Sequence, residues 1–330
     1  MEQKIMQKIK KTSIYNAVLP IILLLLLRFP SLSLEGARKG LLLWMQTVLP
    51  TLLPFMVCMN FMVSLGAIHA LIIPVRPLFR RLLGLSDNGC FVLLGGMLCG
   101  YPMGAKNCSD FLDRGLISLP EARCLYAASS FPSPMFLAGY MMNMANCTVG
   151  PEGGMPIAWQ PVIPLWKLAA AIYLPAVLLF FAASRIYHFQ GYRGEGQPPV
   201  PEKNTPGSGS LLDEALLSSM EVMVKIGGYL MLFSILAVFI RRLPLPGTFP
   251  CALLISIAEM TTGIEYAASS FSGFSRVLLI GFSGAFGGLS GVFQVRSVTK
   301  NAGLSIRHYI FWKAAHGLLT VLILAAFALH

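Results

Sequence analysis

Two charged residues stand in apolar stretches of this chain, where they need a chemical explanation. Lys106 ends the stretch Gly100-Tyr101-Pro102-Met103-Gly104-Ala105-Lys106, and Glu259 lies shortly before the hydroxyl-bearing Thr261 and Thr262. At membrane depth, a carboxylate could coordinate a cation or hydrogen-bond a polar solute. A lysine there could pair with Asp110 four residues later, attract an anion, or extend its ammonium to the membrane surface. Both stretches therefore predict chemistry involving small charged or polar ligands.

Glycine, proline and serine interrupt four apolar runs, and each interruption predicts a break in a helix. The interruptions lie at 95–106, 129–134, 259–263 and 287–294. Hydrocarbon offers no water to free backbone groups, so broken helices persist only inside protein or beside an aqueous cavity. The ends of the half-helices can then point N–H or C=O groups at a ligand. The alternative is that the glycines only let helices pack closely.

The breaks and the neighbouring charges together predict a binding site for a small polar solute or ion near the middle of the membrane. We expect both halves of the chain to contribute to it. The predicted substrate-binding residues are Gly100, Tyr101, Pro102, Gly104, Lys106, Asp110, Ser130, Ser133, Pro134, Glu259, Thr261, Thr262, Gly263, Gly287, Gly288, Ser290 and Gln294. No catalytic residue, metal ligand or cofactor is expected.

The composition is typical of a protein with several membrane spans. Of the 330 residues, 55% are hydrophobic and 12% are charged, whereas soluble domains carry about 25% charged residues. A net charge of +11 would suit a nucleic-acid-binding protein, but the basic residues form short clusters beside apolar runs, as orientation signals do. Nucleic acid is therefore excluded as a partner. The seven cysteines form no CxxC pair, so we expect neither disulfides nor a zinc site.

The apolar runs divide the chain into two halves. The run at 13–29 lacks a signal-peptide cleavage site and is interpreted as an uncleaved span. The segments 34–47 and 211–225 alternate charged and apolar residues. The first predicts an interfacial amphipathic helix, and the second predicts an amphipathic entry that leads into the following span. The other apolar runs lie at 48–73, 90–106, 125–142, 165–184, 226–240, 253–268, 277–295 and 309–329. The predicted domains are an N-terminal span at 1–33, a first half at 34–189, a cytoplasmic linker at 190–210 and a second half at 211–330.

Both halves place their elements in the same order: an amphipathic segment, a span, two broken runs and a final span. Trp166-Lys167 and Trp312-Lys313 open the two final spans. Lysines before the first run predict a cytoplasmic N-terminus, which places the linker inside and residues 143–163 outside. The halves then cross the membrane in opposite senses, as inverted repeats of secondary transporters do. Arg241 and Arg242 fall outside and count against this topology.

An intramembrane protease is an alternative of another class. Residues 281–284 and 288–291 both read G-x-S-G, a motif in which rhomboid proteases place their nucleophilic serine. Ser283 or Ser290 would be that nucleophile, and His316 in the final span would be the base. The motif is short and occurs twice in a glycine-rich region, so it is a weak signal, and we do not expect an enzyme.

The stretch at 100–106 resembles the G-[FY]-P-x-G-A-K signature of the YlbJ-type sporulation integral membrane proteins, which are related to the nucleoside-recognition (Gate) domain group. Shorter similarities lie at 115–122, 133–136, 259–263 and 286–297. The resemblance covers about residues 40 to 320. It implies an all-α polytopic protein of the inner membrane of spore-forming bacteria, and related Gate domains occur in concentrative nucleoside transporters and ferrous-iron transporters. No solute is implied.

The expected fold is an all-α polytopic membrane protein with two repeated halves and broken or re-entrant helices. The expected function is movement of a small polar solute or ion during sporulation, in contact with membrane lipid. Whether further copies of the chain take part is left open. The rival hypothesis is a membrane scaffold for spore-envelope assembly, in which the broken runs pack against each other without an aqueous cavity.

Overall fold

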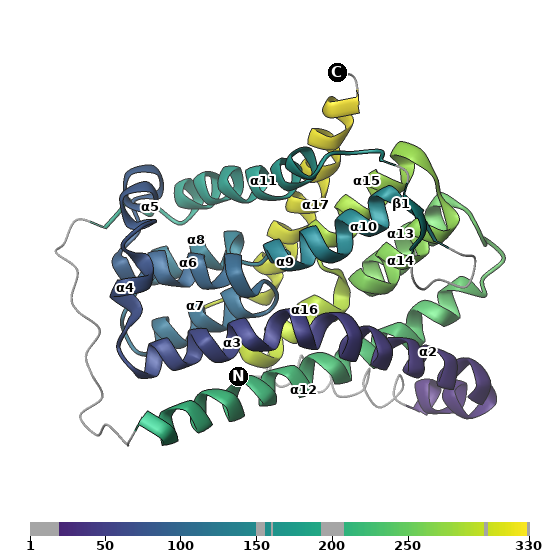
Figure 1. The fold of residues 1–330 in the computed structure, drawn as a ribbon, viewed down its shortest axis with the longest axis horizontal. Coiled ribbons are helices and arrows are strands. Elements are labelled where there is room, and N and C mark those ends of the chain that lie inside the picture. The colour runs from purple at the N-terminus through teal and green to yellow at the C-terminus, as the bar shows by residue number, and fades with distance from the viewer. Residues whose placement is uncertain (1–19, 150–155, 160, 193–207, 300–302, 329–330) are drawn as a thin grey trace, which may run out of the picture.

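The computed structural model describes residues 20–149, 156–159, 161–192, 208–299 and 303–328. Residues 20–28 are helical, and three further segments then form one continuous helical run from Pro30 to Ser64. The run comprises α2 (Pro30–Leu43), η1 (Trp44–Val48) and α3 (Leu49–Ser64), and it packs along the long helix α12 (Ser208–Arg241). Figure 1 shows these two long helices lying along one side of the fold.

Residues 34–47 do not form a separate interfacial helix, so that prediction is wrong. They belong to the continuous run, and Cβ atoms added at Gly36 and Gly40 would lie 2.5 and 2.7 Å from backbone atoms of α12. The two glycines thus allow close approach of two helix backbones, which draws the segment onto α12. The segment 211–225 leads directly into the following span, as predicted, because α12 continues without interruption through both.

The first half continues from α3 through short helices to a long final helix. The predicted span at 48–73 ends early, because α3 stops at Ser64 and a turn follows. The subsequent elements are α4 (Ile68–Ile72), α5 (Arg76–Leu83), α6 (Asp87–Cys99), α7 (Met103–Asp113), α8 (Leu119–Ala128), α9 (Pro134–Phe136), η2 (Leu137–Met141), α10 (Met142–Asn146), β1 (Cys147–Val149), β2 (Pro156–Trp159) and α11 (Leu165–Ile186).

The second half follows the predicted linker, of which residues 193–207 lie outside the described residues. After α12 come α13 (Phe249–Ala258), α14 (Met260–Ser270), α15 (Gly273–Phe286), α16 (Gly288–Val298) and α17 (Ile306–Ala328). Several helices begin at side-chain caps. Thr248 caps α13, for example, by accepting a hydrogen bond from the Cys251 amide. The prediction of a helical protein with broken helices is confirmed.

One small departure from an all-α fold lies in the loop before α11. Strands β1 and β2 pair in an antiparallel hairpin, in which Cys147 faces Trp159. The neighbouring Asn146 holds this loop onto α10, because its Oδ1 accepts hydrogen bonds from the Val162 and Ile163 amides at 2.6 and 2.9 Å. The hairpin closes one end of the helical fold and leaves the fold class unchanged.

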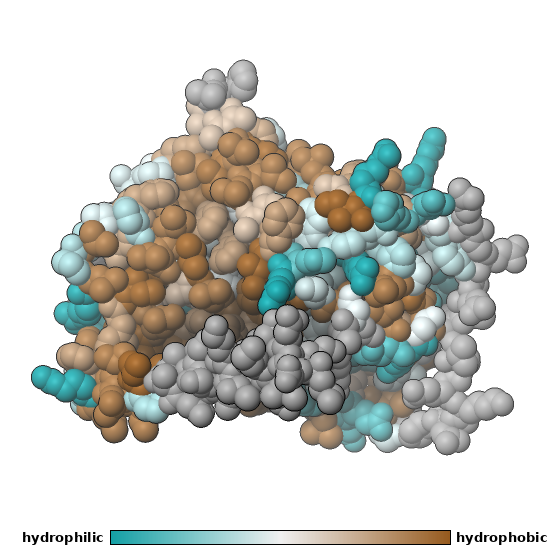
Figure 2. All heavy atoms as spheres, turned by 180° about the vertical axis from the view of Figure 1, so that it is seen from behind, coloured by the Kyte–Doolittle hydropathy of each residue, from teal (hydrophilic) through white to brown (hydrophobic). Residues whose placement is uncertain are grey.

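Several helices are long and apolar enough to cross a membrane. Among the described residues there are five such segments, or six if the bent pair α5–α6, with an angle of 105°, forms one span. The five are Pro30–Ser64, Leu165–Ile186, Gly209–Arg241, Gly273–Val298 and Ile306–Ala328. Figure 2 shows a broad hydrophobic surface, with hydrophilic residues gathered mainly on one side of the view. The chain is an integral membrane protein with several spans.

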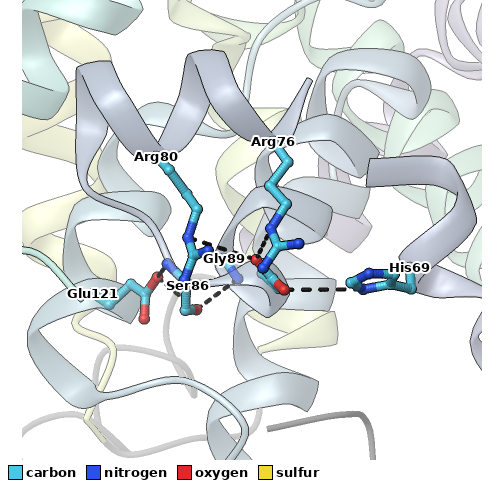
Figure 3. A network of polar contacts seen from close by, with 7 residues as sticks. His69, Arg76, Arg80, Ser86, Gly89 and Glu121 are labelled. Atoms are coloured by element: carbon cyan, nitrogen blue, oxygen red, sulfur yellow. Dashed lines mark hydrogen bonds and ion pairs between the residues drawn. The ribbon is translucent and has the colours of Figure 1, made fainter. Parts of the chain in front are cut away.

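Charged residues join α4 and α5 to the start of α6. The Asp87 carboxylate, in the first turn of α6, lies 2.8 Å from Arg76 Nε. It is also 3.7 Å from Arg80 Nε and 3.9 Å from His69 Nδ1 (Figure 3). A negative charge at a helix N-terminus is favourable in itself. Basic clusters beside apolar runs are typical orientation signals. Here the basic residues Arg76 and Arg80 also hold the sharp bend between α5 and α6.

A second carboxylate ties α8 to the same end of α6. Ser86 caps α6 by accepting a hydrogen bond from the Gly89 amide. Glu121, which is 2% exposed, accepts hydrogen bonds from both the amide and the hydroxyl of Ser86 at 2.8 Å (Figure 3). Burial raises the pKa of the Glu121 carboxyl, and the hydrogen bonds from Ser86 oppose that shift.

Replacing Glu121 with alanine should destabilise the protein by about 2 kcal/mol, because two buried donors of Ser86 would lose their acceptor. The apparent midpoint of thermal unfolding in detergent should fall by about 5 °C. Glu221→Ala is the matched control, since Glu221 pairs with Lys225 on an exposed helix face and such pairs contribute little. Equal midpoints for the two variants would contradict the structural role of Glu121.

Candidate functional site

The four predicted helix breaks are all present. The first break, residues 100–102, separates α6 from α7, and Gly100 has φ +70° there. The second break, residues 129–133, separates α8 from α9. The third is Glu259, which is extended between α13 and α14 with φ −149° and ψ 128°. The fourth is Gly287, with φ +81°, between α15 and α16. Each half thus contributes two breaks.

Glycines allow the two breaks within each half to touch. In the first half, Cβ atoms added at Gly104 and Gly96 would lie 2.1 and 2.2 Å from the Ser129 carbonyl oxygen. In the second half, a Cβ atom added at Gly288 would lie 3.0 Å from the Met260 amide nitrogen. Side chains at these glycines would force the backbones apart. The glycines therefore serve close packing at the same places where the helices are broken.

Residues from all four breaks line one small cavity where the halves meet, together with residues of the helices beside them. Its volume is about 40 Å³, and one water molecule needs roughly 10–15 Å³ of such space. In this conformation the cavity therefore has room for an ion or a few water molecules. Six of the predicted binding residues line it: Tyr101, Ser133, Glu259, Thr261, Gly287 and Gln294.

Glu259 is the buried acid of this cavity, with an exposed fraction of 2%. Its Oε2 accepts hydrogen bonds from Thr261 Oγ1 and from the Thr262 amide, both at 2.6 Å. The side chain therefore caps α14, whose N-terminus favours a negative charge. Its Oε1 accepts no hydrogen bond from any described residue. One oxygen is thus held in place, and the other is left to bind a cation or a polar solute.

Tyr101 connects the first half to the second across the cavity. Its hydroxyl donates a hydrogen bond to the Ala285 carbonyl oxygen at 2.9 Å. Its ring occupies the space beside Gly287, where an added Cβ atom would lie 2.8 Å from the ring. Tyr101 therefore seals one wall of the cavity, and any separation of the first and fourth breaks must displace its ring.

Gln294 also lines the cavity but makes its hydrogen bond within one helix. Its Nε2 donates to Ser290 Oγ, one turn earlier on α16, at 3.0 Å. Among the described residues, this amide makes no hydrogen bond to another helix. The Gln294 carbonyl oxygen remains an acceptor for a ligand.

Lys106 and Asp110 are predicted binding residues that the structure does not bring to this cavity. They pair with each other at 2.8 Å, as their four-residue spacing predicts. Both line a separate cavity of about 180 Å³ between α3, α7 and the start of α12, together with Arg114 and Glu214. The pair therefore lies outside the cavity formed at the helix breaks.

The remaining predicted residues hold the backbone around the cavity. Thr262 Oγ1 lies 3.1 Å from Ser234 Oγ of α12, and an added Cβ atom at Gly263 would lie 2.6 Å from the Ser256 Cα atom. Pro102 precedes α7 as its N-cap, and Pro134 is the first residue of α9. These residues shape the breaks rather than line the cavity.

Lys313 and His316 are two buried residues of α17 that the sequence-based site prediction omits. Their exposed fractions are 0% and 1%. Lys313 Nζ donates to the Ser130 carbonyl oxygen at 2.6 Å and lies 4.7 Å from the centre of the Tyr101 ring. The available signal was a lysine and a histidine three residues apart in an apolar run, since ionisable groups at membrane depth point to function.

The hydrogen bonds of the serines give the protease hypothesis no support. Ser283 Oγ lies 2.7 Å from the Leu279 carbonyl oxygen and 2.8 Å from Ser256 Oγ, and Ser290 accepts from Gln294. Within the described part of the chain, neither serine is hydrogen-bonded to His316. The described residues also contain no group of three or more His, Cys, Asp or Glu side chains placed to hold a metal ion.

Comparison with known proteins gives one informative similarity. The chain is 24% identical over 325 aligned positions to the sporulation integral membrane protein YlbJ of Bacillus subtilis (strain 168). The similarity covers 87% of this chain and 76% of that protein, and it confirms the resemblance to YlbJ-type proteins. No model of a known protein family matches the chain, and no solved structure matches it.

Proposed function

We propose that this protein moves a small polar solute or ion across a bacterial inner membrane, through the cavity at the helix breaks, during sporulation. The observation that carries the proposal is the convergence of breaks from both halves on one cavity beside Glu259. Interrupted helices inside a membrane protein leave backbone groups and helix ends free to meet a ligand. The similarity to a sporulation integral membrane protein supports the biological setting.

The order of elements supports an inverted repeat as the basis of this transport. In each half a long helix leads into a broken pair, a second broken pair and a final helix: α3, α6–α7, α8–α10 and α11, then α12, α13–α14, α15–α16 and α17. With a cytoplasmic N-terminus, the two halves would rock against each other around the cavity. Tyr101, which spans them, would then open and close the path. The nucleoside-recognition Gate group remains the proposed wider family.

The test is uptake by purified protein in sealed phospholipid vesicles. The vesicles are incubated with a small-molecule extract of sporulating Bacillus subtilis cells and washed, and their contents are identified by mass spectrometry. We expect at least one small polar compound or ion to be retained several-fold above protein-free vesicles. If no compound is enriched, the transport function is wrong and the scaffold alternative is favoured.

A further inference from the structure

Two ionisable side chains of α17 lie deep in the fold against the second break. Lys313 and His316 are three residues apart, so they share one helix face. Lys313 Nζ donates to the Ser130 carbonyl oxygen at 2.6 Å and lies 3.1 Å from His316 Nδ1. On the other side of the imidazole, His316 Nε2 lies 2.8 Å from the Ile172 carbonyl oxygen of α11. The imidazole therefore bridges α11 and the lysine.

These contacts fix where the protons of the pair reside. A carbonyl oxygen only accepts, so His316 Nε2 carries a proton and donates it to Ile172. When the imidazole is neutral, its Nδ1 accepts a hydrogen bond from the Lys313 ammonium. If the proton crosses that bond, Nδ1 becomes the donor and the Lys313 amine the acceptor. The pair can hold one excess proton but not two, because a second would set two charged donors 3.1 Å apart.

The surroundings provide no counter-ion for that proton. Among the described residues, no carboxylate lies within 4.0 Å of Lys313 Nζ. The titratable side chains around the pair are Tyr101 of the first break, Tyr309 on α17, and, further out, Tyr126 of α8 and Tyr173 of α11. An excess charge in this place is costly, and ionisable groups at membrane depth are commonly functional.

The charged residues described on the helices packed against α17 form no hydrogen bond or ion pair with Lys313 or His316. Some of these residues donate instead to backbone carbonyl groups elsewhere: Arg123 to Gly303, and Lys167 to Phe327. None of the charged side chains described on these helices contacts Lys313 or His316. They are Glu121, Arg123, Lys167, Arg185, Arg276 and Arg296.

The proton of the pair acts on the cavity through Tyr101. The Lys313 ammonium lies 4.7 Å from the centre of the Tyr101 ring, a distance at which a cation attracts the face of an aromatic ring. The hydroxyl of the same tyrosine binds the Ala285 carbonyl oxygen in the other half, and the ring lines the cavity. Loss of the proton would remove the attraction that keeps the ring in this closed position.

We propose that Lys313 and His316 form a proton-binding site whose occupancy controls the Tyr101 ring and thereby the opening of the cavity. This inference rests on the transport function proposed above and deepens it, because it names the proton as the ion that regulates access to the site. With the proton bound, Tyr101 is held across the halves. When the proton leaves, the ring is released and the cavity opens.

The test measures access to the cavity at different pH values without any solute. Gly291 lines the cavity, and a Cβ atom added there meets nothing within 4 Å, so Gly291→Cys supplies a reporter thiol. A membrane-impermeant thiol reagent is applied to the protein in vesicles from pH 6 to 9, and mass spectrometry quantifies labelling at that position. Lys313→Arg in the same background is the reference, because an arginine stays charged over this range.

We expect the labelling rate with Lys313 present, divided by the rate with Lys313→Arg, to rise at least threefold from pH 6 to pH 9. The division removes the ordinary effect of pH on thiol reactivity. A constant ratio, or no labelling at any pH, overturns the proposal.

Lys313→Met is a second test variant, for use if the arginine variant fails to fold. Methionine is similar in length to lysine but carries no charge. This variant should label at least threefold faster than the unsubstituted lysine at pH 6 and equally fast at pH 9. Equal rates at both pH values overturn the proposal. Since no solute is present, this result concerns the proton site alone, whereas an absence of uptake by vesicles overturns only the transport function.

Discussion

Replacing Glu259 with glutamine should reduce uptake of the transported compound at least tenfold while leaving the fold intact. Glutamine has the same shape, and its carbonyl oxygen can accept the hydrogen bonds that Thr261 and Thr262 donate to the carboxylate. The charge is lost, and hydrogen bonds to charged groups contribute about 1.5–3 kcal/mol. A tenfold change corresponds to about 1.4 kcal/mol. The measurement is initial uptake by reconstituted vesicles, with thermal unfolding measured in parallel.

Glu265→Gln is the matched control for this experiment. Glu265 lies on the same helix, α14, and lines a different cavity beside Arg241. The substitution removes an equal charge from the same element, so we expect uptake close to that of the unsubstituted protein. If the two variants transport equally well, Glu259 serves only as the cap of α14, and the ligand-binding role assigned to its free oxygen is wrong.

The helix breaks could be predicted because each follows from a local property of the chain. Pro132 and Pro134 cannot both lie in a regular helix, and Gly287 adopts a left-handed conformation that other residues resist. Glu259 was predicted from its charge in an apolar run, and it indeed lies in the cavity wall. These features can be predicted without knowing which helices become neighbours in the fold.

The placement of charged segments depends on neighbours that only the tertiary fold provides. Charges in residues 34–47 suggested an interface, although the spacing of Gly36 and Gly40 is typical of close helix packing and was the better signal. Lys106 pairs with Asp110 as their spacing predicts, but the pair lines a separate cavity from that of Glu259. A charge in an apolar run therefore predicts a partner, and the nearest partner along the helix comes first.

Lys313 was overlooked because the sequence placed it at the start of a span, where a lysine is ordinary. In the structure α17 begins at Ile306, so Lys313 lies about two helical turns inside the helix and is fully buried. The boundary of a helix is poorly defined by sequence. A shift of a few residues here changes the interpretation of the lysine from an interfacial residue to a buried one beside Ser130 and Tyr101.

Replacing Gly104 with alanine should destabilise the fold, because an added methyl group there has no room between the first and second breaks. The new Cβ atom would lie 2.1 Å from the Ser129 carbonyl oxygen, and a backbone atom cannot move aside as the end of a side chain can. Overpacking costs about 1–3 kcal/mol or more, against a gain of up to about 1 kcal/mol in helix propensity. We expect the apparent unfolding midpoint in detergent to fall by at least about 5 °C.

Gly139→Ala separates this clash from the general effect of adding a methyl group to a helix. Gly139 is also helical, and an added Cβ atom there meets nothing within 4 Å. Its replacement should leave the midpoint unchanged or raise it slightly, because alanine favours the helix. If Gly104→Ala behaves like this control, the first and second breaks do not touch as described. The cavity they help to enclose would then have a looser wall, and the closed position of Tyr101 would lose its support.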